Sequence, residues 1–350
     1  LHLRRKTKMK KLFILFVALA LVGFTVPAMA TNDHWSFYGS SRLSTFYTSQ
    51  DEDAGDDKGT TWALQGNSRI GASVTGDTVS GGFEYGTGIN LRLLYAKWNF
   101  GGGTLLVGQH YGPANLFYSG QVYGSDAGML NVGGLYTGCN PQINLGVGSF
   151  NLALLTPQSG AVGDDGDSDN TIPKVEASYS LSAGALSAKV AAGYQTYAVE
   201  GSTDAGDYDV TSWVLGLGGG VNIGAVYING NVMTGRNVGN YGMWTTGSSG
   251  AVISGGEIKD TTTIGAIAVV GFKASDQLSF QGGYGYVSHD ADVSGSDADV
   301  TSVFYVQAPI AVASGFSIVP EVGMYNYHED TAGADQGSMT YFGAKWQMNF

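Results

Sequence analysis

After its first 30 residues, the 350-residue chain has no apolar run long enough to cross a bilayer as a helix. This absence excludes a helical membrane protein but leaves another kind of membrane protein open. A transmembrane β-barrel alternates apolar and polar residues along its strands, so its segments do not stand out in hydropathy scans. The chain is rich in glycine (55 residues) and tyrosine (20 residues) and poor in proline (7 residues), which is compatible with such a barrel.

Cysteine and basic residues are also scarce. Cys139 is the only cysteine, which excludes an intrachain disulfide and a metal site built from several cysteines. Six of the 17 lysines and arginines lie in the first 30 residues, so the remainder has 11 against 29 acidic residues, a net charge of −18. Because phosphates bind basic surfaces, this balance argues against a nucleic-acid partner. The histidines show no nucleophile–base spacing, so we expect neither an enzyme nor a cofactor.

The first 30 residues have the pattern of a leader. A basic segment at residues 9–11 precedes an apolar run at residues 12–26, and Ala-Met-Ala follows at residues 28–30. A basic start, a short apolar core and an Ala-x-Ala site are typical of a cleaved secretory signal peptide. We therefore predict two parts. Residues 1–30 are upstream sequence plus signal peptide, and residues 31–350 form one β-barrel domain that starts at Thr31.

The carboxyl end gives a clear strand signal. Residues 341–350 carry apolar side chains at every even position and mostly polar ones between them. This period of two predicts a strand that continues to the last residue, Phe350. A soluble β-sandwich is the alternative. Its apolar faces would point inward to a core, whereas those of a barrel would point outward to lipid.

The same alternation predicts an all-β, antiparallel transmembrane barrel of sixteen strands, joined in turn by short turns and by longer loops. Sixteen strands enclose an aqueous lumen rather than a packed core. The longest connection covers residues 112–140. The expected strands are residues 35–49, 61–75, 79–87, 90–100, 103–111, 141–148, 150–157, 171–182, 185–199, 208–222, 225–235, 259–273, 277–289, 298–311, 315–328 and 338–350.

Two stretches resemble Gram-negative general porins. One is Asn-Ser-Arg-Ile-Gly at residues 67–71, followed by Gly-Phe-Glu-Tyr at 82–85; the other extends from Arg92 through a glycine turn to Tyr111. The resemblance implies a homotrimer in the outer membrane, with a long third extracellular loop folded into the lumen. It also implies that Phe350, together with Met348 and Trp346, forms a signal that the barrel-insertion machinery reads.

Three arginines on early strands are candidates for the pore constriction. Arg42, Arg69 and Arg92 alternate with lipid-facing residues, and an arginine in hydrocarbon costs about 2–4 kcal/mol, so all three should face the lumen. The resemblance implies that they oppose the constriction loop, where Asp126 is the one carboxylate, and Glu84 joins them from the third strand. Three scattered, solvated arginines are the alternative. We also expect these residues to point into lumen water: Lys174, Glu176, Lys189, Glu321 and Lys345.

These features predict a porin for passive diffusion of small hydrophilic solutes and ions, surrounded by outer-membrane lipid and lipopolysaccharide. Acidic outer loops at residues 50–60, 158–170 and 290–297 are expected to be solvated. Weak divalent-cation binding that bridges them to lipopolysaccharide is the alternative. Other functions stay open: a substrate-specific barrel channel, or a structural or adhesive barrel with acidic surface loops. A lipase would need a serine beside His289 or His328 at the lipid-facing rim.

Overall fold

The computed structural model describes residues 34–160, 162, 167–170, 172–200 and 207–350. The predicted signal peptide and the predicted start at Thr31 lie outside these residues, as do Asp164 and Asp165 of one acidic loop. Within the described residues, no helix is both long and apolar enough to span a bilayer.

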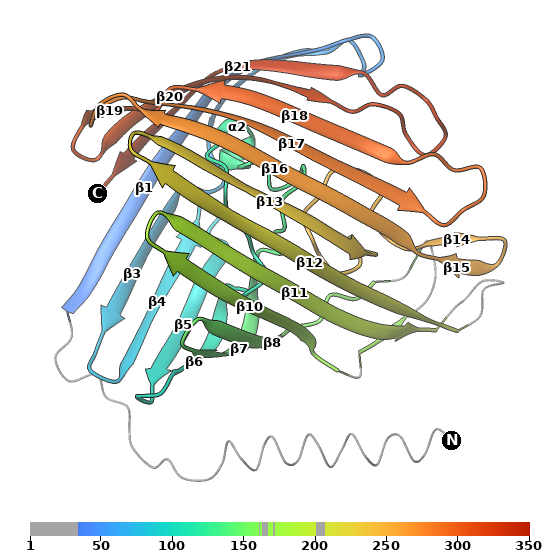
Figure 1. The fold of residues 1–350 in the computed structure, drawn as a ribbon, viewed down its shortest axis with the longest axis horizontal. Coiled ribbons are helices and arrows are strands. Elements are labelled where there is room, and N and C mark those ends of the chain that lie inside the picture. The colour runs from blue at the N-terminus through green and yellow to red at the C-terminus, as the bar shows by residue number, and fades with distance from the viewer. Residues whose placement is uncertain (1–33, 161, 163–166, 171, 201–206) are drawn as a thin grey trace.

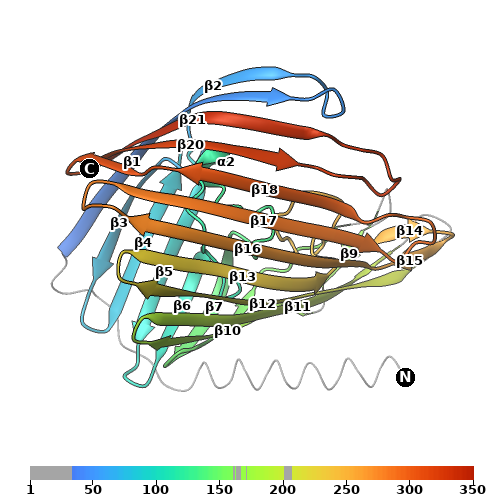
Figure 2. The same ribbon diagram turned by 45° about the horizontal axis from the view of Figure 1, so that its top comes forward.

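Nineteen strand segments form one antiparallel sheet that closes into a barrel (Figures 1 and 2). Some wall strands are made of two segments, so the barrel has the sixteen strands predicted from the sequence. The two-segment strands are β2 (Lys58–Leu64) with β3 (Arg69–Thr75), β9 (Ser168–Asp169) with β10 (Lys174–Ala183), and β18 (Asp299–Gln307) with β19 (Ile310–Ala313). The others are β1 (His34–Gln50), β4 (Val79–Gly86), β5 (Leu91–Asn99), β6 (Thr104–Tyr111), β7 (Cys139–Val147), β8 (Phe150–Leu155), β11 (Leu186–Val199), β12 (Tyr208–Ile223), β13 (Val226–Arg236), β16 (Thr261–Lys273), β17 (Ser279–Ala291), β20 (Phe316–Asn326) and β21 (Ser338–Asn349).

The first and last strands close the wall. β1 pairs with β21 on one side and with β2 and β3 on the other. The final residue takes part in this closure: the Gly39 N–H donates to the Phe350 carbonyl at 2.7 Å, and the Phe350 N–H donates to the Gly39 carbonyl at 3.1 Å. The strand predicted to continue to the carboxyl end is therefore confirmed as the closing strand of the barrel.

The strands turn their larger apolar side chains outward. On β12, Leu215 and Leu217 are exposed, whereas Ser212, Val214 and Gly216 on the opposite face are buried. β13, β16 and β18 repeat the pattern with exposed Val232, Ile264 and Phe304. A soluble sandwich would cover such faces with a second sheet, so the sandwich alternative is wrong.

Two of the longer connections contain secondary structure of their own. The connection between β6 and β7 holds a single short turn, α2 (Tyr123–Asp126), which lies within the outline of the barrel in Figure 1. The connection between β13 and β16 holds a separate hairpin of β14 (Val252–Ser254) and β15 (Glu257–Lys259). These two connections supply most of the site described next.

Candidate functional site

The connection between β6 and β7, residues 112–138, is called the central segment here. Two carboxylates on inward-facing positions of the wall accept hydrogen bonds from it. Glu176 of β10 accepts from the Ala114 N–H at 2.9 Å and from the Thr137 hydroxyl at 3.2 Å. Glu321 of β20, further round the barrel, accepts from the Val122 N–H at 2.7 Å and from the Tyr123 N–H at 2.9 Å. The central segment is therefore bonded to well-separated strands of the wall.

Burial corrects one expectation from the sequence. Glu176 is 0 % exposed, Glu321 is 4 % exposed, and Lys174 is 0 % exposed beside Glu176. These side chains face inward as predicted, but the prediction that they point into water is wrong. The central segment covers the two carboxylates, and Tyr241 of the connection after β13 covers Lys174. Buried carboxylates are stable only when they are well hydrogen-bonded, and backbone N–H groups supply those bonds here.

Apolar contacts hold the central segment between these anchors. Val122, Met129 and Val132 are buried in one cluster with wall residues of β16, β17 and β18. Leu116 and Leu135 are buried in a second cluster against β12 and β13. Phe117 is the exception, because 53 % of its surface stays exposed although its neighbour Leu116 is buried.

Glycines let the central segment approach the wall closely. Gly133 has a φ of 90°, and a Cβ there would collide with the carbonyl oxygens of Ala266 and Tyr286. Gly285 on β17 meets the Val132 carbonyl in the same way. Side chains at these positions would push the central segment away from the wall.

The tip of the central segment turns through three consecutive left-handed residues. Gly124, Ser125 and Asp126 have φ values of 67°, 63° and 59°. For residues other than glycine, this conformation persists only when the surroundings hold it. The break between β2 and β3 does so: the Gly66 N–H donates to the Ser125 hydroxyl oxygen at 3.3 Å, and the Gln65 amide donates to the Val122 carbonyl at 3.3 Å.

Asp126 is the centre of one charged group. Its carboxylate lies 2.7 Å from the Arg42 guanidinium and 2.8 Å from the Lys345 ammonium. The Asn67 amide also donates to it at 2.8 Å. The sequence predicted Arg42 and Asp126 together. Lys345 was expected only to face inward, because alternation along a strand gives direction but not the partner on a distant loop.

Glu84 is the centre of the second charged group. It lies 2.8 Å from the Arg92 guanidinium and 3.4 Å from that of Arg69, and it accepts a hydrogen bond from the Tyr38 hydroxyl at 3.1 Å. Asn67 links the two groups, since its carbonyl accepts from Arg69 at 3.1 Å while its amide binds Asp126. The structure thus brings together all five residues predicted for the constriction. Four cations share two carboxylates.

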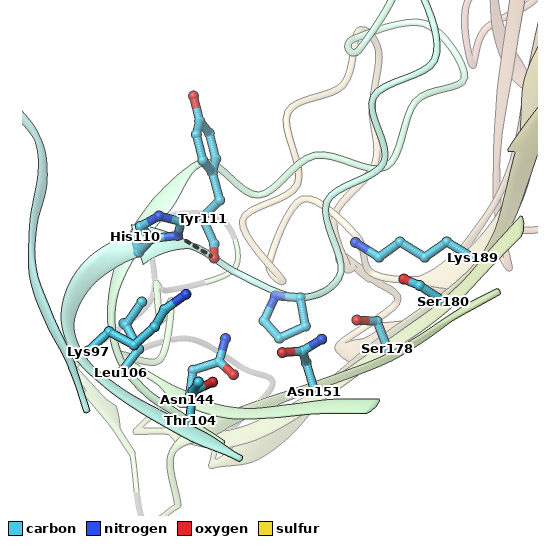
Figure 3. A pocket seen from close by; sticks show the side chains of 11 residues that line it. Lys97, Thr104, Leu106, His110, Tyr111, Asn144, Asn151, Ser178, Ser180 and Lys189 are labelled. Atoms are coloured by element: carbon cyan, nitrogen blue, oxygen red, sulfur yellow. Dashed lines mark hydrogen bonds between the residues drawn. The ribbon is translucent and has the colours of Figure 1, made fainter. Parts of the chain in front are cut away.

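A cavity of about 220 Å³ lies nearby on the inward face of β5 to β8, β10 and β11 (Figure 3). Lys97 and Lys189 contribute its charged side chains, and its lining contains no carboxylate. Asn144, Asn151 and Ser178 are among its uncharged polar residues, and the figure draws them around the same space. The positive charge of the barrel interior therefore extends beyond the two carboxylate-centred groups.

The histidines near the outer ends of the strands differ from one another. His289 is buried and hydrogen-bonded to Thr263 and to the Thr246 carbonyl, at 2.8 Å each. His328 does meet a serine, with 2.9 Å between its Nε2 and the Ser302 hydroxyl. Among the hydrogen bonds of the described residues, none joins the second nitrogen of His328 to an acid. The pair thus lacks the orienting group of a hydrolase triad.

Asp51 of the first acidic loop is hydrogen-bonded to the last strand and to its own loop. Asp51 accepts hydrogen bonds from the N–H and the hydroxyl of Ser338, at 2.8 Å each, which joins the first outer loop to the last. These hydrogen bonds, led by the one from the Ser338 N–H, lower the pKa of Asp51. Within the described residues, no three His, Cys, Asp or Glu side chains lie close enough to hold a metal ion.

The residues expected to form the insertion signal lie on the outer surface. Phe350, Met348 and Trp346 are all exposed. The ring of Phe350 lies over Gly39, where any Cβ would collide with it. The Trp346 indole donates to the Thr45 hydroxyl at 3.0 Å, so its ring is held against the neighbouring strand.

No model of a protein family and no curated protein sequence matches this chain. Solved structures do match over nearly its whole length. The outer membrane channel DcaP of Acinetobacter baumannii has a TM-score of 0.73 at 16% identity, over 94% of this chain and 100% of that one. The anion-selective porin from Comamonas acidovorans has a TM-score of 0.64 at 13% identity, over 91% and 100%. A trimer form of OmpT, an outer membrane protein of Vibrio cholerae, has a TM-score of 0.61 at 17% identity, over 91% and 100%.

The chain has the fold of an outer-membrane porin. The closed sixteen-stranded barrel and its outward apolar faces agree with these neighbours. At such low identity the likeness concerns the fold alone.

The Asp126 group allows a test of how the tip is held. We expect Asp126→Asn to remove two ion pairs and leave Arg42 and Lys345 without a carboxylate. Hydrogen bonds to charged groups contribute about 1.5–3 kcal/mol each, so amide exchange in residues 122–128 should accelerate at least about tenfold. Hydrogen–deuterium exchange measures this. Asp276→Asn is the matched control, since Asp276 pairs with Lys273 on the exposed surface; equal exchange in wild type and Asp126→Asn would contradict the assignment.

Proposed function

We propose that this protein is a passive channel for small hydrophilic solutes and ions in the outer membrane of a Gram-negative bacterium. The central segment would lie across the lumen and form its narrowest part with Arg42, Arg69 and Arg92. The observation that carries the proposal is the set of six charged side chains inside a barrel whose outer face is apolar. Charged side chains in that position are stable only where water solvates them, and a water-filled passage through the barrel supplies that water.

The charges also indicate a preference. Two positive charges stay unmatched when Arg42, Arg69, Arg92 and Lys345 share two carboxylates, and Lys97 and Lys189 add to them. Charges in a narrow lumen are screened less than charges on an open surface. We therefore propose that anions pass the constriction more readily than cations. The anion-selective porin from Comamonas acidovorans shares the fold, which agrees with the proposal.

Conductance in a planar bilayer tests the channel directly. We expect stable open steps, and we expect deletion of about ten residues between 119 and 129 to raise their conductance. The wall strands satisfy their own backbone hydrogen bonds, so the shortened protein should keep a heat-resistant barrel. Its uncovered wall carboxylates would then be solvated. An absence of open steps would refute the channel, and equal conductance would put the central segment outside the passage.

The three arginines should set the charge preference. A unit charge about 7 Å from a passing ion contributes about 0.6 kcal/mol even in water, close to RT. Replacing Arg42, Arg69 and Arg92 together with Ala should therefore raise the cation-to-anion permeability ratio at least about threefold. The reversal potential in a salt gradient measures this ratio. Arg236→Ala is the control, because Arg236 pairs with Asp260 at 3.0 Å at the outer end of β13; an unchanged potential in the triple variant would count against the assignment.

We also propose a homotrimer, because one strand edge needs a cover. In the described part of the chain, β2 pairs with β1 alone, and its other edge has no strand beside it. Trp62 on this edge is 75 % exposed and lies level with Thr45 and Ala344, within the outward apolar band. Open sheet edges do not occur in lipid, so a second copy is the natural cover. OmpT of Vibrio cholerae, which shares the fold, is described in a trimer form.

A charge on this edge should separate the copies. We expect Trp62→Asp to convert the oligomer to a folded monomer, because the interface would have to bury an unpaired carboxylate. Trp62→Phe keeps an apolar ring there and should keep the oligomer. Native mass spectrometry or a heat-modifiability gel measures the change. An oligomer that survives Trp62→Asp would show that the copies meet elsewhere.

Two further parts of the proposal concern the surroundings. The exposed residues Phe350, Met348 and Trp346 are proposed as the signal that the insertion machinery reads, and the outward apolar faces as the surface that contacts lipid. Lipopolysaccharide would surround the outer rim.

We propose transport rather than catalysis. A substrate-specific channel of the same architecture is the second candidate, and the exposed Phe117 favours it.

A further inference from the structure

A row of aromatic side chains lies beside the Glu84 group. Tyr111 comes from the end of β6, Phe117 and Tyr136 from the two arms of the central segment, and Trp244 from the connection after β13. Successive ring centroids are 5.4 Å apart for Tyr111 and Phe117, 5.7 Å for Phe117 and Tyr136, and 6.1 Å for Tyr136 and Trp244. Three separate parts of the chain thus build one continuous aromatic surface, called the aromatic row here.

The aromatic row is open on one side. Phe117 is 53 % exposed and Trp244 is 43 % exposed. Neither belongs to the outward apolar faces of the strands. The backbone N–H of Trp244 donates to the Tyr136 carbonyl at 2.9 Å, and the Asn131 amide of the central segment donates to the Thr246 hydroxyl. Residues 244–246 are therefore held against the central segment. Exposed aromatic rings away from lipid need another explanation, and ligand binding is a common one.

Positive charge adjoins the row at one end. The Arg92 guanidinium donates to the Tyr111 hydroxyl at 2.7 Å and to Glu84 at 2.8 Å. A guanidinium has five N–H donors, so Arg92 keeps donors beyond these two bonds. Burial, with smaller contributions from Tyr111 and Cys139, raises the pKa of Tyr136 to about 12, so this phenol stays neutral at ordinary pH. The row therefore presents apolar ring faces next to a cation that shares its carboxylate with Arg69.

We propose that the aromatic row and Arg92 form a binding site for solutes that combine an aromatic ring with a carboxylate. The ring of the solute stacks on Phe117, the exposed ring next to Tyr111, and the carboxylate accepts hydrogen bonds from Arg92, which is bonded to Tyr111. Neither half suffices alone, because a ring without charge lacks the guanidinium and a carboxylate without a ring lacks the stacking surface. This inference rests on the proposed channel, and it makes the channel selective within the class of small anions.

Block of the ion current by three probes tests the site. Phenylacetate carries both groups, acetate carries the carboxylate alone, and benzyl alcohol carries the ring alone. We expect phenylacetate to reduce the current through single channels at concentrations about tenfold lower than either partial probe. Equal potency of phenylacetate and acetate would overturn the proposal, because the ring would then contribute nothing.

Substitutions in the aromatic row test whether phenylacetate blocks the current by binding there. Phe117→Ala should raise the half-blocking concentration of phenylacetate severalfold and leave that of acetate unchanged. Phe304→Ala is the matched control, since Phe304 is comparably exposed on the outward face of β18. If Phe117→Ala does not weaken the block, the row is not the site.

Calorimetry separates this inference from the proposed function. Titration of phenylacetate into the purified protein reports binding whether or not current flows. Open steps without selective binding would overturn the inference and keep the channel. Binding that is lost in Phe117→Ala, in a protein that gives no open steps, would support the site and refute the channel.

Discussion

Every strand of this protein needs two hydrogen-bonded neighbours, and the rest of the structure depends on that requirement. A backbone N–H or carbonyl in hydrocarbon has no water to bind, so a spanning sheet must close. Closure is completed by β1 and β21, down to the paired N–H and carbonyl groups of Gly39 and Phe350. Once the sheet is closed, period-two alternation leaves only two environments for side chains. Apolar side chains on the outside are exposed to lipid, whereas the inside holds the charged side chains and those that the central segment covers.

An inward face of polar side chains does not form a core by itself. The central segment forms a core with the wall through hydrogen bonds to buried carboxylates and through apolar contacts. Its backbone N–H groups bind Glu176 and Glu321, and its apolar side chains pack against apolar residues of the wall. Removing one partner from such buried contacts costs more than the contact contributes, because the other partner stays desolvated. The position of the central segment is therefore determined by many anchors along its length.

Much of the fold could be predicted because alternation, turn residues and chain length constrain a barrel strongly. The sixteen strands and the terminal strand were predicted, although the breaks in β2–β3, β9–β10 and β18–β19 were not. The inward direction of Arg42, Arg69 and Arg92 followed from the cost of charge in lipid. The partners of Glu176, Glu321 and Lys345 were missed, since they lie on a segment without periodicity. Phe117 is exposed although its neighbour Leu116 is buried, and nothing in the local sequence distinguishes the two.

The charges of the chain are divided between two regions with opposite sign. The described lumen-facing groups leave positive charge unmatched, whereas the outer loops are rich in aspartate. Charges on exposed loops are screened within about 10 Å at 0.1 M salt, but those inside a narrow passage are screened less. Under the proposed function, the loops would influence which ions gather at the mouth only at low salt, and the interior groups would act at every salt concentration. For a solute that also carries an aromatic ring, stacking adds a contribution that salt does not screen. The binding of such a solute would therefore depend less on salt concentration than the passage of simple ions does.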